Sequence, residues 1–381
     1  MSGHLPPSAP ASDRASAPAP PRVLILRALG LGDFLTAVPA YRALRAAYPG
    51  HEIVLAAPAG LAPLAALTGA VDRVLATGEL EPVPWRGSPP AVAADLHGNG
   101  PASHDLVRAV GAPVTMMYAS PADPGVAGPW WAEEEHEVDR WCRLLGWWGI
   151  PADPGALRLS RPRTRPPAAA AVVHPGAASG SRRWPAERFA AVARVLSDWG
   201  LPVVISGNAA ERPLADRVAQ AAGLSPASVL AGHTGLVGLA AVVAAASVVI
   251  SNDTGIAHLA VAYGTPSVTL FGPVSPALWG PPQDSPRHLA LWKGSGARPG
   301  DAHGARPDPR LLRIEVGEVL EAAGRLSRRT GGRPSDAAAP RATGARPRRA
   351  EGSPGGRAAP TAGLLPPGLP RWRWPDPSAP T

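Results

Sequence analysis

The sequence predicts an α/β protein built from two Rossmann-like domains. Short β-branched strand patterns alternate with helical patterns over residues 22–148, and the same alternation starts again over residues 171–271. A segment rich in proline and arginine, residues 151–167, separates the two runs. Alternating strands and helices form parallel sheets with right-handed crossovers. Because the two units are similar in size, we expect two domains that face each other across a cleft.

The first unit opens on Arg22–Leu26 (RVLIL), a run typical of a strand buried on both faces. A helical pattern follows over residues 34–48, and it contains Pro39, where we expect a kink. Further strands are expected at residues 53–57, 71–76 and 92–96, and an amphipathic helix over 137–148.

The second unit repeats this order. Strands are expected at residues 171–174, 203–206, 248–251 and 268–271, with helices over 187–199, 209–222, 236–245 and 256–263. The uncharged stretch 234–252 reaches the length of a membrane span, but its small residues favour a buried helix followed by a buried strand.

The two ends of the chain differ in composition from the middle. The chain has 42 glycines and 49 prolines among 381 residues, and residues 331–381 hold 11 of those prolines with 8 arginines and 3 acids. Such a segment buries too little apolar surface to offset its ordering entropy. We therefore predict disordered tails at residues 1–21 and 327–381. Between them we expect an N-terminal domain over 22–160, a C-terminal domain over 168–310 and a closing helix over 311–326.

Charge and cysteine content exclude some classes of protein. The formal net charge is +8, and residues 331–381 contribute +5 of it, so the rest of the chain does not require a basic groove for nucleic acid. Cys142 is the only cysteine, which excludes an intramolecular disulfide and a cysteine-based zinc cage. The N-terminus lacks the basic-then-apolar pattern of a signal peptide, so we expect a cytoplasmic protein.

The first candidate site is Gly30-Leu31-Gly32-Asp33, between the first strand and the first helix. Glycines here let a ligand approach the backbone, and a carboxylate at this sheet edge can take a proton from an acceptor hydroxyl. The alternative is that Asp33 caps the helix. The third glycine of a dinucleotide fingerprint is missing, which disfavours a nicotinamide oxidoreductase.

The second candidate site is the stretch 251–258 (SNDTGIAH), which follows a predicted strand and opens a helix. Thr254 and Gly255 would present a hydroxyl and N–H groups at the positive helix end, where a diphosphate binds well. The alternative is helix capping by Asp253 or Thr254, with His258 as a core histidine. An aspartic protease, which also uses Asp-Thr-Gly, needs two such loops on an all-β scaffold and is excluded.

The remaining candidates lie in the same unit. A loop of small residues from Gly176 to Ser181 leads into Arg182 and Arg183, which together suit an anion, although a solvated loop explains them as well. Glu211 follows another strand, where an acid often holds ribose hydroxyls; the alternative is a solvated residue at a helix start. Their common position at strand ends suggests a nucleotide diphosphate in this unit.

These stretches resemble glycosyltransferase family 9, the ADP-heptose:lipopolysaccharide heptosyltransferase family. The resemblance implies a GT-B fold, in which the last helix crosses back to the first domain, and inverting sugar transfer without a bound metal or other cofactor. The matching stretches are 23–39 (VLILRALGLGDFLTAVP), 48–50 (YPG), 95–98 (DLHG), 174–185 (HPGAASGSRRWP), 207–212 (GNAAER), 251–258 (SNDTGIAH), 264–266 (GTP) and 270–273 (LFGP).

The resemblance also implies roles for single residues. Asp33 matches the general base, and Arg182 matches a position usually held by lysine that contacts the phosphates. Glu211 matches the acid that binds the nucleoside ribose. The expected catalytic residues are Asp33 and Arg182, and the expected donor-binding residues are Gly32, Gly176, Ser181, Glu211, Asp253, Thr254, Gly255 and His258.

We therefore expect an inverting glycosyltransferase that moves a heptose-like sugar from a nucleotide-diphosphate donor, such as ADP-heptose, to a glycan or lipid-linked acceptor. We expect a cytoplasmic monomer that binds no nucleic acid; a peripheral contact with the inner face of the plasma membrane stays open. The alternatives are a sugar-nucleotide epimerase of the same fold and a non-enzymatic protein that binds anions through its arginine-rich tail.

Overall fold

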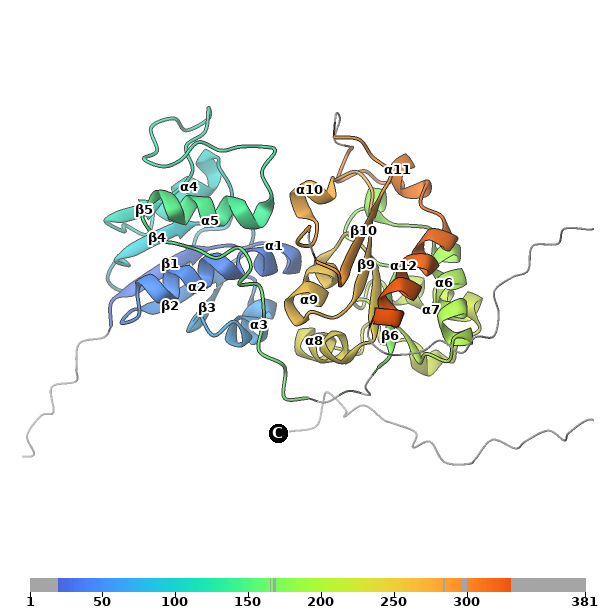
Figure 1. The fold of residues 1–381 in the computed structure, drawn as a ribbon. Coiled ribbons are helices and arrows are strands. Elements are labelled where there is room, and N and C mark those ends of the chain that lie inside the picture. Colours follow the sequence, from blue (N-terminus) through green and yellow to red (C-terminus); the bar gives the residue numbers. More distant parts are fainter. Residues whose placement is uncertain (1–19, 165, 167–168, 284, 297–299, 330–381) are drawn as a thin grey trace, which may run out of the picture. The chain divides into compact units, whose positions relative to one another are not determined.

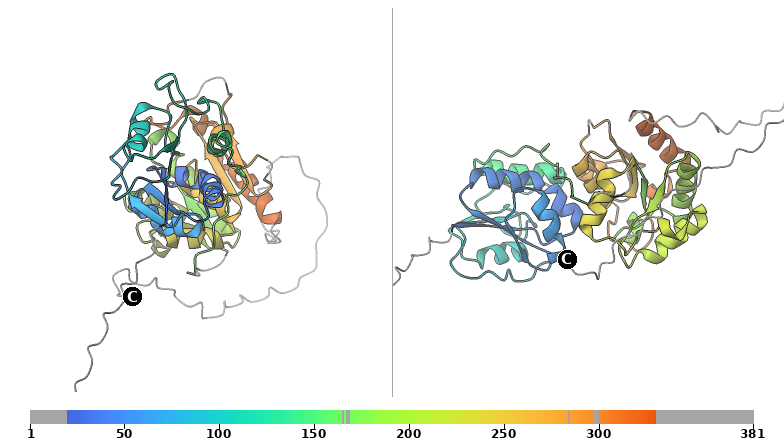
Figure 2. Two further views of the ribbon diagram at one scale, coloured as in Figure 1. Left: turned by 90° about the vertical axis from the view of Figure 1, so that its left-hand side faces the viewer. Right: turned by 90° about the horizontal axis from the view of Figure 1, so that it is seen from below.

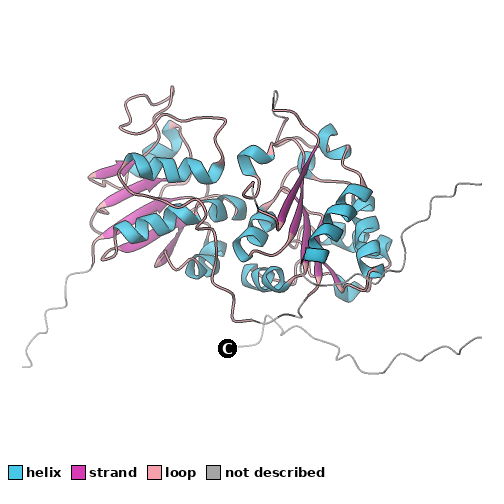
Figure 3. Ribbon diagram, in the orientation of Figure 1, coloured by secondary structure: helices cyan, strands magenta, loops and turns pink. Residues whose placement is uncertain are grey.

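The computed structural model describes residues 20–329 apart from 165, 167–168, 284 and 297–299. These residues form two five-stranded sheets in which neighbouring strands run parallel (Figures 1 and 3), as the sequence predicts. The first sheet has the order β3-β2-β1-β4-β5. Its strands are β1 (Arg22–Leu26), β2 (Glu52–Ala57), β3 (Arg73–Ala76), β4 (Val92–Asp95) and β5 (Val114–Met116).

The helix expected over residues 34–48 is divided in two. Ala37 ends α1 and starts α2, and Pro39 takes the second position of α2, where a missing N–H costs no hydrogen bond. The predicted kink is thus confirmed as a break. The helical segments of this lobe are α1 (Leu31–Thr36), α2 (Val38–Ala47), η1 (Ala59–Leu61), α3 (Ala62–Leu67), α4 (Pro101–Arg108) and α5 (Glu137–Trp147).

The second sheet has the order β10-β9-β8-β6-β7. Its strands are β6 (Ala171–His174), β7 (Val203–Ile205), β8 (Val248–Asn252), β9 (Ser267–Phe271) and β10 (His288–Trp292). The helical segments of this lobe are η2 (Gly180–Arg182), α6 (Ala186–Asp198), α7 (Arg212–Ala222), η3 (Pro226–Ser228), α8 (Leu236–Ala245), α9 (Gly255–Tyr263), α10 (Pro276–Trp279), α11 (Pro309–Leu312) and α12 (Val316–Arg329).

Burial explains why these runs are strands. Val23, Leu24 and Ile25 are fully buried at the centre of the first sheet, and β8 is buried along its whole length in the second. The uncharged stretch 234–252 forms α8 and then β8, which confirms the prediction of a buried helix and strand. Within the described part of the chain, no helix has the length and apolar character needed to span a bilayer.

The two sheets each contain a point where the strand order reverses, between β1 and β4 and between β6 and β8. In register, Leu26 pairs with Asp95 in the first sheet, and His174 pairs with Ser251 in the second. Ligands of open parallel sheets bind beyond the carboxyl ends of strands at such points. The loops after β1, β4, β6 and β8 therefore mark where a site belongs.

The helical region expected over 311–326 does not lie where we predicted, across the first domain. It consists of α11 and α12, and Val319, Ala322 and Ala323 of α12 are buried in the core of the second lobe. Figures 1 and 2 show α12, in orange-red, beside the helices of that lobe, and it packs on α6, β8 and β9. Because the apolar face of α12 is buried in the second lobe, these residues do not make the expected crossing to the first domain. The predicted tails lie almost entirely outside the described residues.

Candidate active site

Two glycines bring α1 and α9 into close contact. A Cβ at Gly32 would lie 3.2 Å from Cδ2 of His258, and a Cβ at Gly255 would lie 2.8 Å from Cβ of Leu31. A larger residue at Gly255 would displace Leu31, whereas one at Gly32 would need only a small shift of the His258 ring. The contact places the helix that carries Asp33 against the turn that begins at Thr254, so two of the predicted site segments lie together.

Asp33 occupies the third position of α1, because Gly30 is the residue that starts this helix. The prediction that Asp33 caps the helix is therefore wrong. Its side chain is 29% exposed, and its Oδ1 lies 3.6 Å from Nη2 of Arg27. Burial raises the pKa of Asp33 above its ordinary value, and the Arg27 guanidinium opposes that rise. The carboxylate is thus accessible to a ligand and a better proton acceptor than a solvated aspartate.

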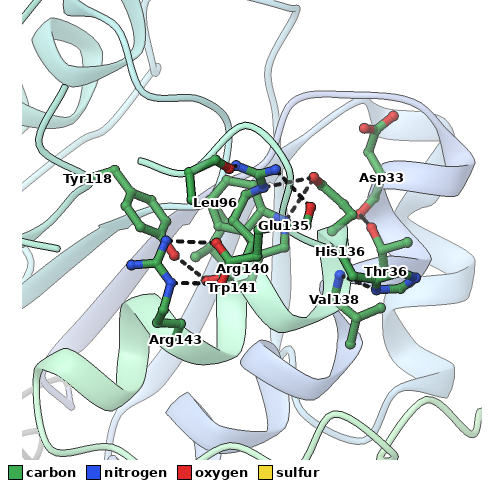
Figure 4. A network of polar contacts seen from close by, with 12 residues as sticks. Asp33, Thr36, Leu96, Tyr118, Glu135, His136, Val138, Arg140, Trp141 and Arg143 are labelled. Atoms are coloured by element: carbon green, nitrogen blue, oxygen red, sulfur yellow. Dashed lines mark hydrogen bonds and ion pairs between the residues drawn. The ribbon is translucent and has the colours of Figure 1, made fainter. Parts of the chain in front are cut away.

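Arg27 is a buried neighbour of Asp33 that the sequence reasoning did not single out. It is fully buried, and it donates to Oε1 of Glu137 at 2.8 Å and to the backbone oxygen of Asp33 at 2.9 Å. Its guanidinium lies over the Trp141 ring, whose Nε1 donates to the same Glu137 oxygen. Figure 4 shows Asp33, Thr36 and Trp141 around this network. A charged residue directly after the buried strand RVLIL was the available signal.

The turn after β8 exposes an uncapped helix start. Thr254 starts α9 with an extended backbone, and no side chain accepts a hydrogen bond from the first N–H groups of this helix. The alternative prediction of a capping Asp253 or Thr254 is therefore wrong. These N–H groups can bind an anion, since α9 is long enough to carry a helix dipole.

Asp253 and Arg182 form an ion pair between the loops after β8 and β6. Oδ2 of Asp253 lies 3.6 Å from Nη1 of Arg182, and the Asp253 side chain is only 5% exposed. Burial raises the pKa of Asp253 to about 6, although Arg182 opposes the rise. Burial also lowers the pKa of the nearby His258 to about 4. At neutral pH the pair is therefore charged and the His258 ring is neutral.

Asn252, a second residue missed from the sequence, joins these loops. Its Nδ2 donates to the backbone oxygens of Pro175 and Gly176 at 2.9 and 3.2 Å, and its Oδ1 accepts from the Trp184 N–H at 3.0 Å. Asn252 is fully buried at the end of β8. Both ends of the loop from 175 to 184 are therefore fixed to the strand that leads into the Asp253 turn.

Gly176 makes room for Glu211. A Cβ at Gly176 would lie 2.1 Å from Oε1 of Glu211, which no side chain could accommodate without displacing the acid. Oε2 of Glu211 accepts from the Asn208 N–H at 2.8 Å. The predicted glycine and the predicted ribose-binding acid therefore lie in contact at the ends of β6 and β7.

Two residues of the same loop are placed differently from expectation. Ser181 is buried beneath residues 301–308, because its N–H donates to the Gly304 oxygen at 2.8 Å and its hydroxyl lies 3.1 Å from that of Ser179. Arg183 donates from Nε to the Ala177 oxygen at 2.9 Å. Of the two adjacent arginines, only Arg182 pairs with Asp253.

A cavity of about 360 Å³ borders the contact between α1 and α9. Thr36 and His258 line it, whereas Asp33 and Arg182 do not. It is therefore separate from the acid and the ion pair described above. Within the described ranges, no group of three or more His, Cys, Asp or Glu side chains is placed to hold a metal ion.

Comparison with known proteins finds relatives in one family. The family model described as glycosyltransferase family 9 (heptosyltransferase) matches residues 129–298, which include Arg182, Glu211 and the Asp253 turn. Lipopolysaccharide heptosyltransferase 1 of Pseudomonas aeruginosa is 29% identical over 299 residues, which cover 70% of this chain and 83% of that protein. Over these residues the chain is similar to glycosyltransferase family 9.

Other similar proteins match shorter parts of the chain. Lipooligosaccharide heptosyltransferase 2 of Haemophilus influenzae is 34% identical over 139 residues, or 34% of this chain and 39% of that protein. The alignment with lipopolysaccharide heptosyltransferase 2 of Escherichia coli covers 38% of that protein. The chain thus spans about two fifths of the length of these two relatives.

Solved structures establish the fold. The structure of E. coli ADP-heptose lps heptosyltransferase II superposes with a TM-score of 0.66 at 22% identity, covering 81% of this chain and 99% of that one. A family 9 glycosyltransferase from Veillonella parvula gives a TM-score of 0.65 at 19% identity, over 82% and 99%. The predicted GT-B fold of two Rossmann-like domains is confirmed.

Proposed function

We propose that this protein is a family 9 glycosyltransferase that moves a heptose-like sugar from a nucleotide-diphosphate donor to a hydroxyl of a glycan or lipid-linked acceptor in lipopolysaccharide synthesis, with inversion. The observation that carries the proposal is the contact between α1 and α9, which puts Asp33 on the helix that abuts the uncapped Thr254 turn. E. coli heptosyltransferase WaaC has been crystallised with ADP and with ADP-2-deoxy-2-fluoro heptose, which supports an ADP-linked donor here.

The proposed reaction is a single displacement. Asp33 takes the proton of the acceptor hydroxyl, the hydroxyl oxygen attacks the anomeric carbon, and the bond from that carbon to the phosphate oxygen breaks. The raised pKa of Asp33 favours this proton transfer. Arg182 and the N–H groups at the start of α9 stabilise the negative charge that develops on the leaving diphosphate.

The Asp253 ion pair has a consequence for donor binding. While Asp253 is ionised, it holds the guanidinium that the diphosphate needs and repels the phosphate charge. Arg182 thus has two competing anionic partners, and the phosphate can replace the carboxylate. We propose that Glu211 binds the ribose hydroxyls from the adjacent strand end, because Gly176 gives it direct access to the loop.

Replacing Arg182 with alanine should raise the donor Kd by about 10–100-fold, because a charge-assisted hydrogen bond to phosphate is lost. Isothermal titration with a sugar nucleotide measures the change. Arg182→Lys should recover part of the affinity. Arg183→Ala is the matched control, since Arg183 points to a backbone oxygen and its loss should leave the Kd near the wild-type value. Equal effects of the two alanine variants would contradict this role of Arg182.

Donor affinity should rise by about tenfold between pH 8 and pH 5, if the bound diphosphate raises the Asp253 pKa by about one unit. Affinity should rise as the pH falls because Asp253, whose pKa is about 6, becomes protonated. The neutral acid releases Arg182 and no longer repels phosphate. A sugar nucleotide is the correct probe, because its diphosphate does not titrate in this range. Asp253→Asn should remove the pH dependence of donor affinity. If the dependence remains in this variant, another titrating group causes it.

A transfer assay tests the proposed function. The full chain is incubated with ADP-, UDP- and GDP-linked sugars, with and without a lipopolysaccharide-derived glycan acceptor, and released nucleoside diphosphate and glycan mass are measured. We expect acceptor-dependent release with an ADP-linked heptose and an inverted anomeric centre by NMR. Donor conversion without acceptor would favour a sugar-nucleotide epimerase instead. We further propose that the enzyme acts as a cytoplasmic monomer.

A further inference from the structure

His97 follows β4 at the point where the first sheet reverses its strand order. Because Leu26 and Asp95 pair in register, the segment after β4 continues beside the segment after β1. That second segment leads from Arg27 to Asp33. His97 therefore lies at the same sheet edge as the proposed base, and both the Asp33 carboxylate and the Arg27 guanidinium act electrostatically on its ring.

One hydrogen bond fixes which ring nitrogen of His97 carries the proton. The Ala28 N–H donates to Nδ1 of His97 at 3.2 Å, so Nδ1 is an acceptor and the neutral ring has its proton on Nε2. Burial lowers the pKa of His97, so the ring stays neutral at pH 7. Nε2 has no hydrogen-bond partner among the residues that the structure describes, and the residue is half-buried. A single, oriented donor is therefore free for a ligand.

The backbone around His97 is held from both sides. Oδ1 of the fully buried Asp95 accepts from the N–H groups of His97 and Gly98 at 2.8 and 3.4 Å. Arg27, which also binds the Asp33 backbone, donates to the Leu96 oxygen. The same buried arginine thus holds the backbone of Leu96, next to His97, and that of Asp33, so both segments are fixed to one side chain.

We propose that His97 binds the acceptor sugar beside Asp33. Its Nε2 donates a hydrogen bond to a hydroxyl oxygen adjacent to the hydroxyl that receives the donor sugar. This inference rests on the proposed function. A neutral N–H donor suits a sugar hydroxyl, whereas a phosphate or carboxylate group is bound more strongly by a cation such as arginine. Together Nε2–H and the carboxylate of Asp33 offer one donor and one acceptor, which is what two neighbouring hydroxyls of a sugar ring require.

Two variants separate the two nitrogens of the ring. His97→Asn keeps an oxygen near the position of Nδ1, which can accept from Ala28, but has no donor near Nε2. His97→Gln can place an amide N–H near Nε2 and loses the Ala28 contact. We expect the asparagine variant to raise the acceptor KM by about tenfold with an unchanged donor KM, and the glutamine variant to recover most of that loss.

Three kinetic results overturn the inference: an unchanged acceptor KM in His97→Asn, an equal loss in both variants, or a parallel rise in the donor KM. Long-range ¹⁵N–¹H NMR of the wild-type protein at pH 7 gives a readout that needs no activity, and a ring protonated on Nδ1 would also overturn it. If the wild-type chain transfers no sugar at all, the proposed function fails; if it does and His97→Asn matches it, only the role of His97 fails.

Discussion

Asp33→Asn should lower the proposed rate of sugar transfer by about 10²–10⁴-fold, while the donor Kd should stay near the wild-type value. The amide has nearly the shape of the carboxylate but cannot accept the proton of the acceptor hydroxyl. Donor binding is spared because the diphosphate contacts are proposed for Arg182 and the start of α9, on the other lobe. Initial rates of nucleoside diphosphate release measure the first effect, and isothermal titration measures the second.

Asp105→Asn is the matched control for this experiment. Asp105 lies on α4 of the same lobe, and its side chain is 72% exposed. Among the described residues, its ion-pair partner is Arg108, one helical turn away. Removing that charge should leave both rate and donor affinity unchanged. Near-normal turnover by the Asp33 variant would remove Asp33 from the mechanism, whereas a loss in both variants would indicate a general effect of acidic charge in this lobe.

Arg27→Met should lower the free energy of unfolding by about 1–3 kcal/mol, because the buried Glu137 carboxylate loses one of its two arginine partners. The other partner, Arg140, keeps its Nε at 3.2 Å from Oε2 of Glu137. Glu137 has an 8% exposed side chain, so water cannot replace the lost guanidinium. The Leu96 and Asp33 backbone oxygens lose their donor as well. Urea unfolding followed by tryptophan fluorescence gives the change, since Trp141 lies in the same network.

Arg73→Met provides the comparison for Arg27. Arg73 also lies in the first sheet and pairs with an acid, Glu52, at 2.8 Å, but its side chain is 43% exposed. A solvated ion pair of this kind contributes about 0–1 kcal/mol, so the variant should unfold close to the wild-type midpoint. A loss below about 1 kcal/mol in Arg27→Met would contradict the importance assigned to the buried network.

The fold was largely predictable because most of its strands are buried apolar runs. Residues 22–26, 171–174 and 236–245 have the predicted bounds, since a buried strand or helix has a sharp change of hydropathy at each end. The prediction did not include β5 or β10: β5 has only three residues, and β10 is an edge strand with partly exposed residues. Short or half-exposed strands have patterns too weak to separate from loops.

The candidate site was predictable in its residue types and less so in its contacts. Gly32 and Gly255 were expected to admit a ligand, whereas the structure shows each of them facing the helix of the other lobe. Arg27, Asn252 and His97 act through partners that a local pattern cannot indicate, because those contacts depend on which strands become neighbours. Asp33, Arg182 and Glu211 stay predictions as functional residues.

The ion pair between Arg27 and Glu137 joins residues 110 positions apart. During synthesis on the ribosome, Arg27, directly after β1, therefore emerges long before Glu137, the nearer of its acidic partners Asp33 and Glu137. An incomplete chain that buried this cation alone would face a large desolvation penalty, so nascent β1 is expected to remain hydrated until α5 has left the exit tunnel. We therefore expect the buried network around Arg27 to form late, after α5 has emerged.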